Sequence, residues 1–309
     1  MDFRIAEFLS QPLLLDESHA RWLTSMFKAR GAISSDLGVN DVRLIAEKQA
    51  STAKAQSSRV TAVLPISGMI DQRDSMMMQI FGGTSVESLI QGVDICLNEP
   101  RIGGIIFNIY SPGGSAYGVK EAADYIYNAR SEIAMVSISN SIMASAAYYL
   151  GSAASRVYAS PSSVTGSIGV YLEHYDQSKA LQEQGVTATI VRVPEYKAEG
   201  HPDEPLSTEG LSQMKQRCAA IYEQFSGDVA KYRGVSRVTV DEEYGMGRTL
   251  NASQAYSCGM VDKVATLSEV SAGMRTGSIM RSLAQSSKMG LAVDSVMARN
   301  KMNAITSGW

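Results

Sequence analysis

Cysteine is scarce in this chain, and basic residues are not in excess. The 309 residues include only three cysteines, Cys96, Cys218 and Cys258. An odd number at wide spacings favours reduced thiols in a cytosolic setting and argues against a disulfide framework. The formal net charge is −3, so the composition has no basic surplus that would favour nucleic acid as a partner.

Histidines are few, and long apolar runs are absent. The three histidines are scattered, and no pair of cysteines has metal-ligand spacing, so we expect no metal site and no other cofactor. No run approaches the roughly 18 apolar residues that indicate a membrane span. The N-terminus also lacks the basic and apolar regions of a signal peptide. We therefore expect a soluble chain without a membrane anchor.

The composition is that of a folded protein with more than one part. It is 45% hydrophobic and 19% charged, which is enough apolar material for a core and unlike a disordered chain. A small, polar stretch at 50–58 (ASTAKAQSS) is typical of a linker. We predict a helical N-terminal extension with this linker over 1–57, a main domain over 58–267, and a flexible or docking tail over 268–309.

From residue 59 onward, short apolar segments alternate with helical patterns. Strands are predicted at 60–66, 103–110, 133–139, 156–159, 168–172, 187–193 and 261–264, and helices at 17–28, 39–54, 84–98, 116–132, 177–184, 208–233 and 252–258. Strands separated by helices of this kind indicate βαβ units and a mainly parallel α/β sheet. The apolar side chains that recur along 208–233 are typical of ordinary core packing. The run Met76–Met78 suits an adaptable contact surface or, more simply, core filling.

A serine lies where one predicted strand turns into a helix. The strand at 133–139 runs into the turn Met143–Ala147, in which small neighbours leave room beside Ser145. A serine on such a turn can present its hydroxyl in a cleft while backbone N–H groups face the same point. We interpret Ser145 as a candidate nucleophile.

A serine nucleophile needs a base, and two residues downstream are candidates. Lys197 follows the predicted strand at 187–193, and His174 follows the one at 168–172. An ordinary lysine has a pKa of about 10.4 and a general base works best near 7–8, so a lysine in this role must be buried and oriented. Ser167 is placed to supply an orienting hydrogen bond. Taken alone, each candidate base is more typical of a surface residue, and both remain open at this point.

Acyl transfer also needs donors for a developing oxyanion. Gly113 and Gly114 follow a predicted buried strand, and glycine lets backbone N–H groups approach a ligand closely. The N–H of Ala146, next to the candidate nucleophile, is a natural second donor. A lone Ser-Pro-Gly-Gly is usually only a turn, but a glycine turn, a serine turn and a downstream base in one βαβ series favour acyl transfer.

Four blocks together resemble the signal peptide peptidase A family of serine–lysine peptidases over about residues 59–265. They are Ser111-Pro112-Gly113-Gly114, Ala144-Ser145-Ala146-Ala147-Tyr148-Tyr149, Thr165-Gly166-Ser167-Ile168-Gly169-Val170, and Lys197. The resemblance implies a Clp-protease/crotonase-like fold with Ser145 as nucleophile, Lys197 as general base and Ser167 holding the lysine. It also implies an oxyanion hole formed by Gly113 or Gly114 together with Ala146. Many cellular members carry two glycines where this chain has Ala146 and Ala147, a change that keeps the N–H groups and narrows the pocket.

Within that family the chain is most similar to the phage head-maturation branch. The similarity lies in residues 11–15 (QPLLL), in the polar linker and in residues 200–202 (GHP). It implies a homo-oligomeric endopeptidase of the host cytoplasm or viral procapsid that cleaves scaffold, capsid or portal proteins and often itself. Two alternatives are a cellular peptidase that degrades signal peptides and a non-catalytic capsid assembly or scaffold protein. A crotonase-like acyl-CoA enzyme is less consistent, because the serine and the lysine would then be idle.

Overall fold

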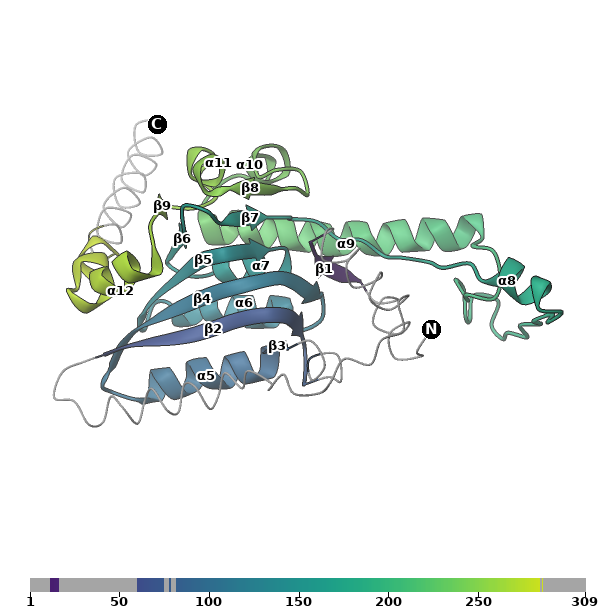
Figure 1. Cartoon of the computed structure of the whole chain (residues 1–309), viewed down its shortest axis with the longest axis horizontal. Coiled ribbons are helices and arrows are strands. Elements are labelled where there is room, and N and C mark those ends of the chain that lie inside the picture. The colour runs from purple at the N-terminus through teal and green to yellow at the C-terminus, as the bar shows by residue number, and fades with distance from the viewer. Residues whose placement is uncertain (1–11, 17–59, 75–77, 79–81, 284, 286–309) are drawn as a thin grey trace, which may run out of the picture.

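The main sheet is parallel along its whole central path. The computed structural model describes residues 12–16, 60–74, 78, 82–283 and 285. Within these residues the central strand order is β3-β2-β4-β5-β6-β9, and all of these neighbours pair in parallel (Figure 1). The predicted α/β fold with a mainly parallel sheet, the plan implied by the Clp-protease/crotonase-like resemblance, is confirmed. The helices predicted at 17–28 and 39–54 lie outside the described residues.

The bounds of most elements are close to the predicted ones, but the strand predicted at 168–172 is wrong. Those residues form only an isolated bridge, from Tyr171 to Leu13, and the strand in this region lies earlier, at Val164–Gly166. The strands are β1 (Leu13–Leu15), β2 (Val60–Asp71), β3 (Gly83–Ser85), β4 (Ile102–Ser115), β5 (Ala134–Ala144), β6 (Arg156–Ala159), β7 (Val164–Gly166), β8 (Thr249–Asn251) and β9 (Lys263–Val264). The helices are α5 (Val86–Asn98), α6 (Val119–Ala129), α7 (Ala146–Ser152), α8 (Ser178–Glu183), α9 (Thr208–Arg233), α10 (Arg237–Glu243), α11 (Ala252–Ser257) and α12 (Leu267–Arg275). Among the helices in the described ranges, none is both long and apolar enough to cross a membrane.

The central strands are buried on both faces. In β4, Ile105 and Phe107 belong to one apolar cluster, whereas Ile106 between them belongs to a second one. Residues of α5, α6, α7 and α9 contribute to the first cluster, and α12 contributes to the second. Side chains alternate along a strand, so a strand covered on both faces appears as a continuous apolar run. This explains why residues 103–110 (GGIIFNIY) form a nearly continuous apolar run and do not alternate between apolar and polar side chains.

Strand β2 is longer than the strand predicted at 60–66, so it takes up part of the segment before α5. Strand β2 continues to Asp71 and pairs with β3. The Thr84 hydroxyl donates to the Ser67 carbonyl oxygen at 3.0 Å, and the Ser85 hydroxyl caps α5 by accepting from the Ser88 N–H at 3.2 Å. Met78 is 1% exposed, which supports core filling for this methionine; Met76 and Met77 lie outside the described residues.

The predicted C-terminal tail begins with a packed helix. Thr266 and Glu269 form a capping box at the start of α12. Val270 and Met274 are each 1% exposed and pack in the second cluster with Ile106 of β4. The first part of the segment predicted as flexible or docking therefore covers the sheet. The division into domains itself stays a prediction.

Truncating Met274 tests whether α12 is part of the folded domain. We expect Met274→Ala to lower the free energy of unfolding by about 2–5 kcal/mol, because a large buried side chain is replaced by a cavity. The exposed Arg275 gives a matched control, since a surface substitution such as Arg275→Ala changes stability by about 0.5 kcal/mol or less. Urea unfolding measures both. Equal effects of the two changes would mean that α12 does not contribute to the core.

One segment projects away from the sheet. We call residues 173–207 the arm; it carries α8 and reaches beyond the sheet to the N-terminal end of α9 (Figure 1). The strand predicted at 187–193 is wrong, because these residues form no strand. Val191 and Val193 are 89% and 88% exposed. A strand needs a neighbour to bond its backbone groups, and the described part of the chain offers none here.

The large buried side chains of helix α9 lie in its C-terminal half. Phe225 is buried and stacks on Tyr149 of α7, with 4.4 Å between ring centroids. Asp228 accepts a hydrogen bond from the Tyr149 hydroxyl at 2.5 Å and pairs with Lys120 of α6 at 3.0 Å. Leu211, in the N-terminal half, is 44% exposed. The prediction of ordinary core packing along the whole helix is therefore wrong for its first turns.

Candidate active site

Ser145 occupies a sharp turn between β5 and α7. Its backbone has φ 57° and ψ −118°, a conformation that costs a non-glycine residue about 1–3 kcal/mol and is common at functional sites. The turn is held from both sides. The Ser145 N–H donates to the Gly166 carbonyl oxygen at 2.7 Å, and the Tyr149 N–H donates to the Ser145 carbonyl oxygen at 2.9 Å. The strand-to-helix turn predicted from the small residues is thus present.

The Ser145 hydroxyl is buried and unpaired. The residue is 1% exposed, and its Oγ has no hydrogen-bond partner among the described residues. An unpaired buried hydroxyl costs about 1–3 kcal/mol, so its presence requires an explanation. It also means that none of the candidate partners, Lys197, His174 or Ser167, is hydrogen-bonded to it within this chain.

Ser167 follows the strand next to Ser145. Strands β5 and β7 run in parallel with Ala144 opposite Gly166, so Ser145 and Ser167 follow paired residues at neighbouring strand ends. Ser167 also has a positive φ of 53°, is 7% exposed, and donates its N–H to the Arg248 carbonyl oxygen at 2.9 Å. The two serines therefore lie side by side, each in a strained conformation held by a backbone hydrogen bond.

The glycine pair lies within β4 and admits no side chain. Gly113 has φ 104°, and a Cβ placed there would lie 2.0 Å from the Leu14 carbonyl oxygen and 3.0 Å from the Ala144 carbonyl oxygen. A Cβ at Gly114 would lie 1.9 Å from the Ile70 carbonyl oxygen. Only glycine fits at either position. Gly113 therefore contacts both the residue that precedes Ser145 and strand β1.

Two backbone donors lie beside the Ser145 turn. Ala146 is the first residue of α7, and the first N–H groups of a helix have no partner within the helix. The Gly113 N–H donates to the Ser111 hydroxyl over a long 3.2 Å. Fixed N–H groups of this kind can stabilise a negative oxygen that forms on a carbonyl attacked by the serine.

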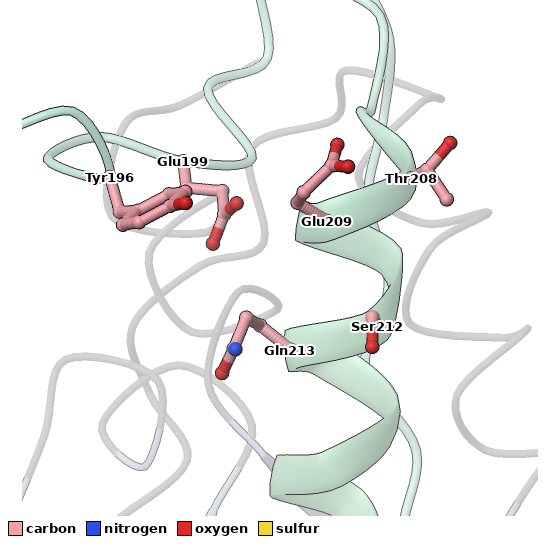
Figure 2. Close-up of a pocket in the computed structure, with 6 residues that line it drawn as sticks. All are labelled: Tyr196, Glu199, Thr208, Glu209, Ser212 and Gln213. Carbon is pink, nitrogen blue, oxygen red and sulfur yellow. The ribbon is translucent and has the colours of Figure 1, made fainter.

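Lys197 lies on the arm, away from Ser145. It is exposed, in a tight turn where its N–H donates to the Pro194 carbonyl oxygen at 3.0 Å. Its neighbours Tyr196 and Glu199 face the first turns of α9 (Figure 2). A pocket of about 640 Å³ at this place is lined by Tyr196, Glu199, Thr208, Glu209, Ser212 and Gln213.

The length of α9 separates the lysine from the serine. A helix rises 1.5 Å per residue, so Thr208 beside the arm lies about 25 Å along the axis from Phe225. Phe225 stacks on Tyr149, which is one helical turn after Ser145. A single chain therefore does not bring Lys197 within proton-transfer reach of Ser145.

The second candidate base, His174, does not reach Ser145 either. It lies at the start of the arm, and its Nε2 is 3.4 Å from the His201 carbonyl oxygen. The ring of His174 thus contacts a later segment of the arm.

Sequence reasoning missed one element of the site. Strand β1 lies against Gly113–Ser115 of β4, whereas residues 11–15 entered the prediction only through a family resemblance. The signal was the short apolar run Leu13–Leu15, which is fully buried. Its pairing with β4 joins segments about one hundred residues apart, and no local pattern indicates such a contact.

A family model matches about half of the chain, and the matched part contains both Ser145 and Ser167. Residues 128–280 match Peptidase family S49. The chain carries a Peptidase family S49 domain. The matched range includes Ser145, Ser167 and Lys197, whereas the glycine pair at 113–114 precedes it.

Phage proteins match over more of the chain than the family model does. The chain is 29% identical to the "Head-tail preconnector protein GP5" of Enterobacteria phage P21 over 88% of its length, and 28% identical to "Capsid assembly protease C" of Escherichia phage lambda over 86%. It spans 56% and 63% of the length of these two relatives. "Serine protease SPPA, chloroplastic" of Arabidopsis thaliana is 28% identical over 59% of this chain and 27% of that protein.

Proposed function

We propose that this S49 domain is a serine endopeptidase in which Ser145 attacks the substrate and Lys197 of a second copy of the chain is the base. One observation carries the proposal: Ser145 combines a strained turn with a buried, unpaired hydroxyl that lies beside Gly113. Ordinary packing gives no reason for this combination. A catalytic nucleophile explains it, because its hydroxyl must be free to contact a base and a substrate carbonyl.

The chemistry follows from the groups around the turn. A neutral lysine amine takes the proton of the Ser145 hydroxyl as Oγ bonds to the scissile carbonyl carbon. The N–H groups of Gly113 and Ala146 stabilise the oxyanion. The lysine then gives the proton to the leaving amine as the C–N bond breaks, and water releases the acyl group by the reverse sequence. In this scheme the Ser167 hydroxyl orients the lysine amine.

The exposed apolar side chains of the arm support a second copy as the source of the lysine. Val191, Val193 and Tyr196 are 89%, 88% and 63% exposed, and Leu211 of α9 is 44% exposed. The first three of these residues lie on the same arm as Lys197, and residues 187–193 pair with no strand of the described part of the chain. Packing the arm on another copy buries these side chains and removes water from the amine, which favours its neutral form. The proposal therefore includes a homo-oligomer.

The phage relatives support a substrate in the phage head. One of them is named a capsid assembly protease and the other a head-tail preconnector protein. We infer that this domain cleaves scaffold, capsid or portal proteins during assembly of a procapsid. A cellular role, such as degradation of signal peptides, is less well supported, because the chloroplast protease, a cellular relative, matches a smaller share of the chain. A purely structural role in the capsid leaves the strained serine unexplained.

Covalent labelling tests the nucleophile. We expect a fluorophosphonate probe to add one label per active site at Ser145, located by mass spectrometry of digested protein, and no label in Ser145→Ala. Ser226 of α9 is a matched control, because its hydroxyl is also buried and has no partner in the described ranges, but it lies in a regular helix. Ser226→Ala should label as the wild type does. Labelling of another serine, with Ser145→Ala still hydrolysing peptide, contradicts the proposal.

A further inference from the structure

Strand β1 is enclosed by two segments, one of which is the end of β4 that carries the glycine pair of the candidate active site. On one side Leu13–Leu15 pairs antiparallel with Gly113–Ser115, with Leu14 opposite Gly114. On the other side Leu13 exchanges two backbone hydrogen bonds with Tyr171, at 3.2 and 3.3 Å. The three leucines are 0–3% exposed. β1 is thus a buried strand between these two segments.

The pairing continues beyond the three leucines. The Asp16 N–H donates to the Pro112 carbonyl oxygen at 2.8 Å, and the Ala116 N–H donates to the Pro12 carbonyl oxygen at 3.1 Å. In an antiparallel ladder hydrogen-bonded pairs alternate with non-bonded ones. These two bonds therefore place Leu14 and Gly114 in a hydrogen-bonded pair between them. Residues 12–16 form one extended segment along β4.

This segment lies directly beside the candidate nucleophile. The position of a Cβ at Gly113 is 2.0 Å from the Leu14 carbonyl oxygen and 3.0 Å from the Ala144 carbonyl oxygen, so both groups contact the same glycine. Ser145, the next residue after Ala144, is 1% exposed with β1 in this place. The backbone groups that line this side of the site are therefore already occupied by the chain itself.

We infer that β1 occupies the substrate groove, and that a peptide substrate binds by replacing it as an antiparallel strand between β4 and Tyr171. This inference rests on the proposed peptidase function. Extended peptides commonly bind by adding a strand to a sheet, with main-chain bonds for affinity and side-chain pockets for specificity. The pockets that now bury Leu13–Leu15 select substrates with consecutive apolar side chains.

An attached strand of this kind restrains the enzyme. A segment linked to its own groove competes at an effective concentration in the millimolar range. A free peptide at micromolar concentration therefore binds weakly until β1 leaves. The restraint is reversible, because β1 is held by hydrogen bonds and apolar contacts alone.

A disulfide lock provides the direct test. Leu13 and Tyr171 form a hydrogen-bonded antiparallel pair, whose Cα atoms are typically about 5.5 Å apart, within the range of disulfides. The variant Leu13→Cys/Tyr171→Cys is made in full-length protein that also carries Ser145→Ala, so that turnover does not affect binding. The three native thiols remain in this protein, so protein with Ser145→Ala alone is the control for their oxidation.

The probe is a fluorescein-labelled peptide of the sequence Gln-Pro-Leu-Leu-Leu-Asp, followed by fluorescence anisotropy. We expect the reduced protein to bind it at least about tenfold more tightly than the oxidised protein, because the lock holds the competing strand in place. Protein with Ser145→Ala alone should bind equally under both conditions. If the locked and reduced forms bind the peptide with equal affinity, the inference is overturned, since β1 would then be a fixed part of the site that peptide binding does not displace.

A second variant keeps the test independent of the disulfide. Leu14→Asp places a charge on the buried strand and should raise peptide affinity at least about tenfold, since burial of an unpaired charge is costly. Leu14→Met, which conserves volume, should not. If Leu14→Asp binds no better, the inference fails. A separate outcome distinguishes the two proposals. If the disulfide and Leu14→Asp both change peptide affinity as expected, but the probe does not label Ser145 and the protein does not hydrolyse peptide, the groove assignment stands and the proposed catalytic function fails.

Discussion

Two inactive variants, Ser145→Ala and Lys197→Ala, are expected to regain peptidase activity when they are assembled together. Each alone should lose at least about a thousandfold in kcat/KM, because removal of either member of a nucleophile–base pair abolishes most of the catalysis that depends on it. In a mixed oligomer the intact Lys197 of one variant meets the intact Ser145 of the other. The physical basis is the span of α9, which keeps these residues apart within one chain.

Coexpression of the two variants with different affinity tags isolates the mixed oligomer, and a fluorogenic apolar peptide reports activity. Random one-to-one assembly should give about a quarter of the wild-type rate, since one interface in four combines both intact residues. Lys197→Ala mixed with the double variant Ser145→Ala/Lys197→Ala is the control and should remain inactive. A mixed oligomer as inactive as its parents contradicts the two-chain site. Full activity of Lys197→Ala together with loss of activity in His174→Ala would assign the base to His174.

Adding a single methyl group at Gly113 should lower kcat/KM by at least about a hundredfold. A Cβ there overlaps the Leu14 carbonyl oxygen at 2.0 Å and crowds the Ala144 carbonyl oxygen at 3.0 Å, and the φ of 104° disfavours any side chain. The backbone must therefore move, and it carries a proposed oxyanion donor beside Ser145. A displacement of about 1 Å in a catalytic group can cost a hundredfold in rate.

Gly234→Ala separates this effect from backbone strain alone. Gly234 ends α9 with φ 67°, and a Cβ there meets no atom within 4 Å. Its substitution should cost about 1 kcal/mol in stability and leave kcat/KM unchanged. Peptide hydrolysis and thermal unfolding of both variants provide the comparison. If Gly113→Ala kept wild-type activity, the glycine pair would have no part in the oxyanion hole.

The local parts of the site could be predicted because short-range sequence determines them. Small residues around Ser145 indicate a turn after an apolar strand, and the turn is there. The predicted bounds of α9 match Thr208–Arg233, because Ser207 caps its first turn and Gly234 ends it in a left-handed conformation. Ser167 lies beside Ser145 because parallel strands end at the same edge of a sheet.

Other features depended on contacts that no local pattern contains. The residues at 187–193 are rich in β-branched side chains, as strands are, yet most of them lie exposed, because a strand forms only where a neighbour accepts its hydrogen bonds. α12 packs on the sheet because Val270 and Met274 find apolar residues of β4 and β5 there, although the surrounding composition suggested a loose tail.

The sequence by itself determined the α/β class, the serine turn and the glycines beside it, since apolar periodicity, small residues and glycine act over a few neighbouring positions. Only the tertiary structure decided that Lys197 lies far from Ser145 and that strand β1 lies next to the Ser145 turn. Both facts depend on the direction in which a long helix and a distant strand leave the sheet. That direction is set by the packing of many side chains together, so no single segment specifies it.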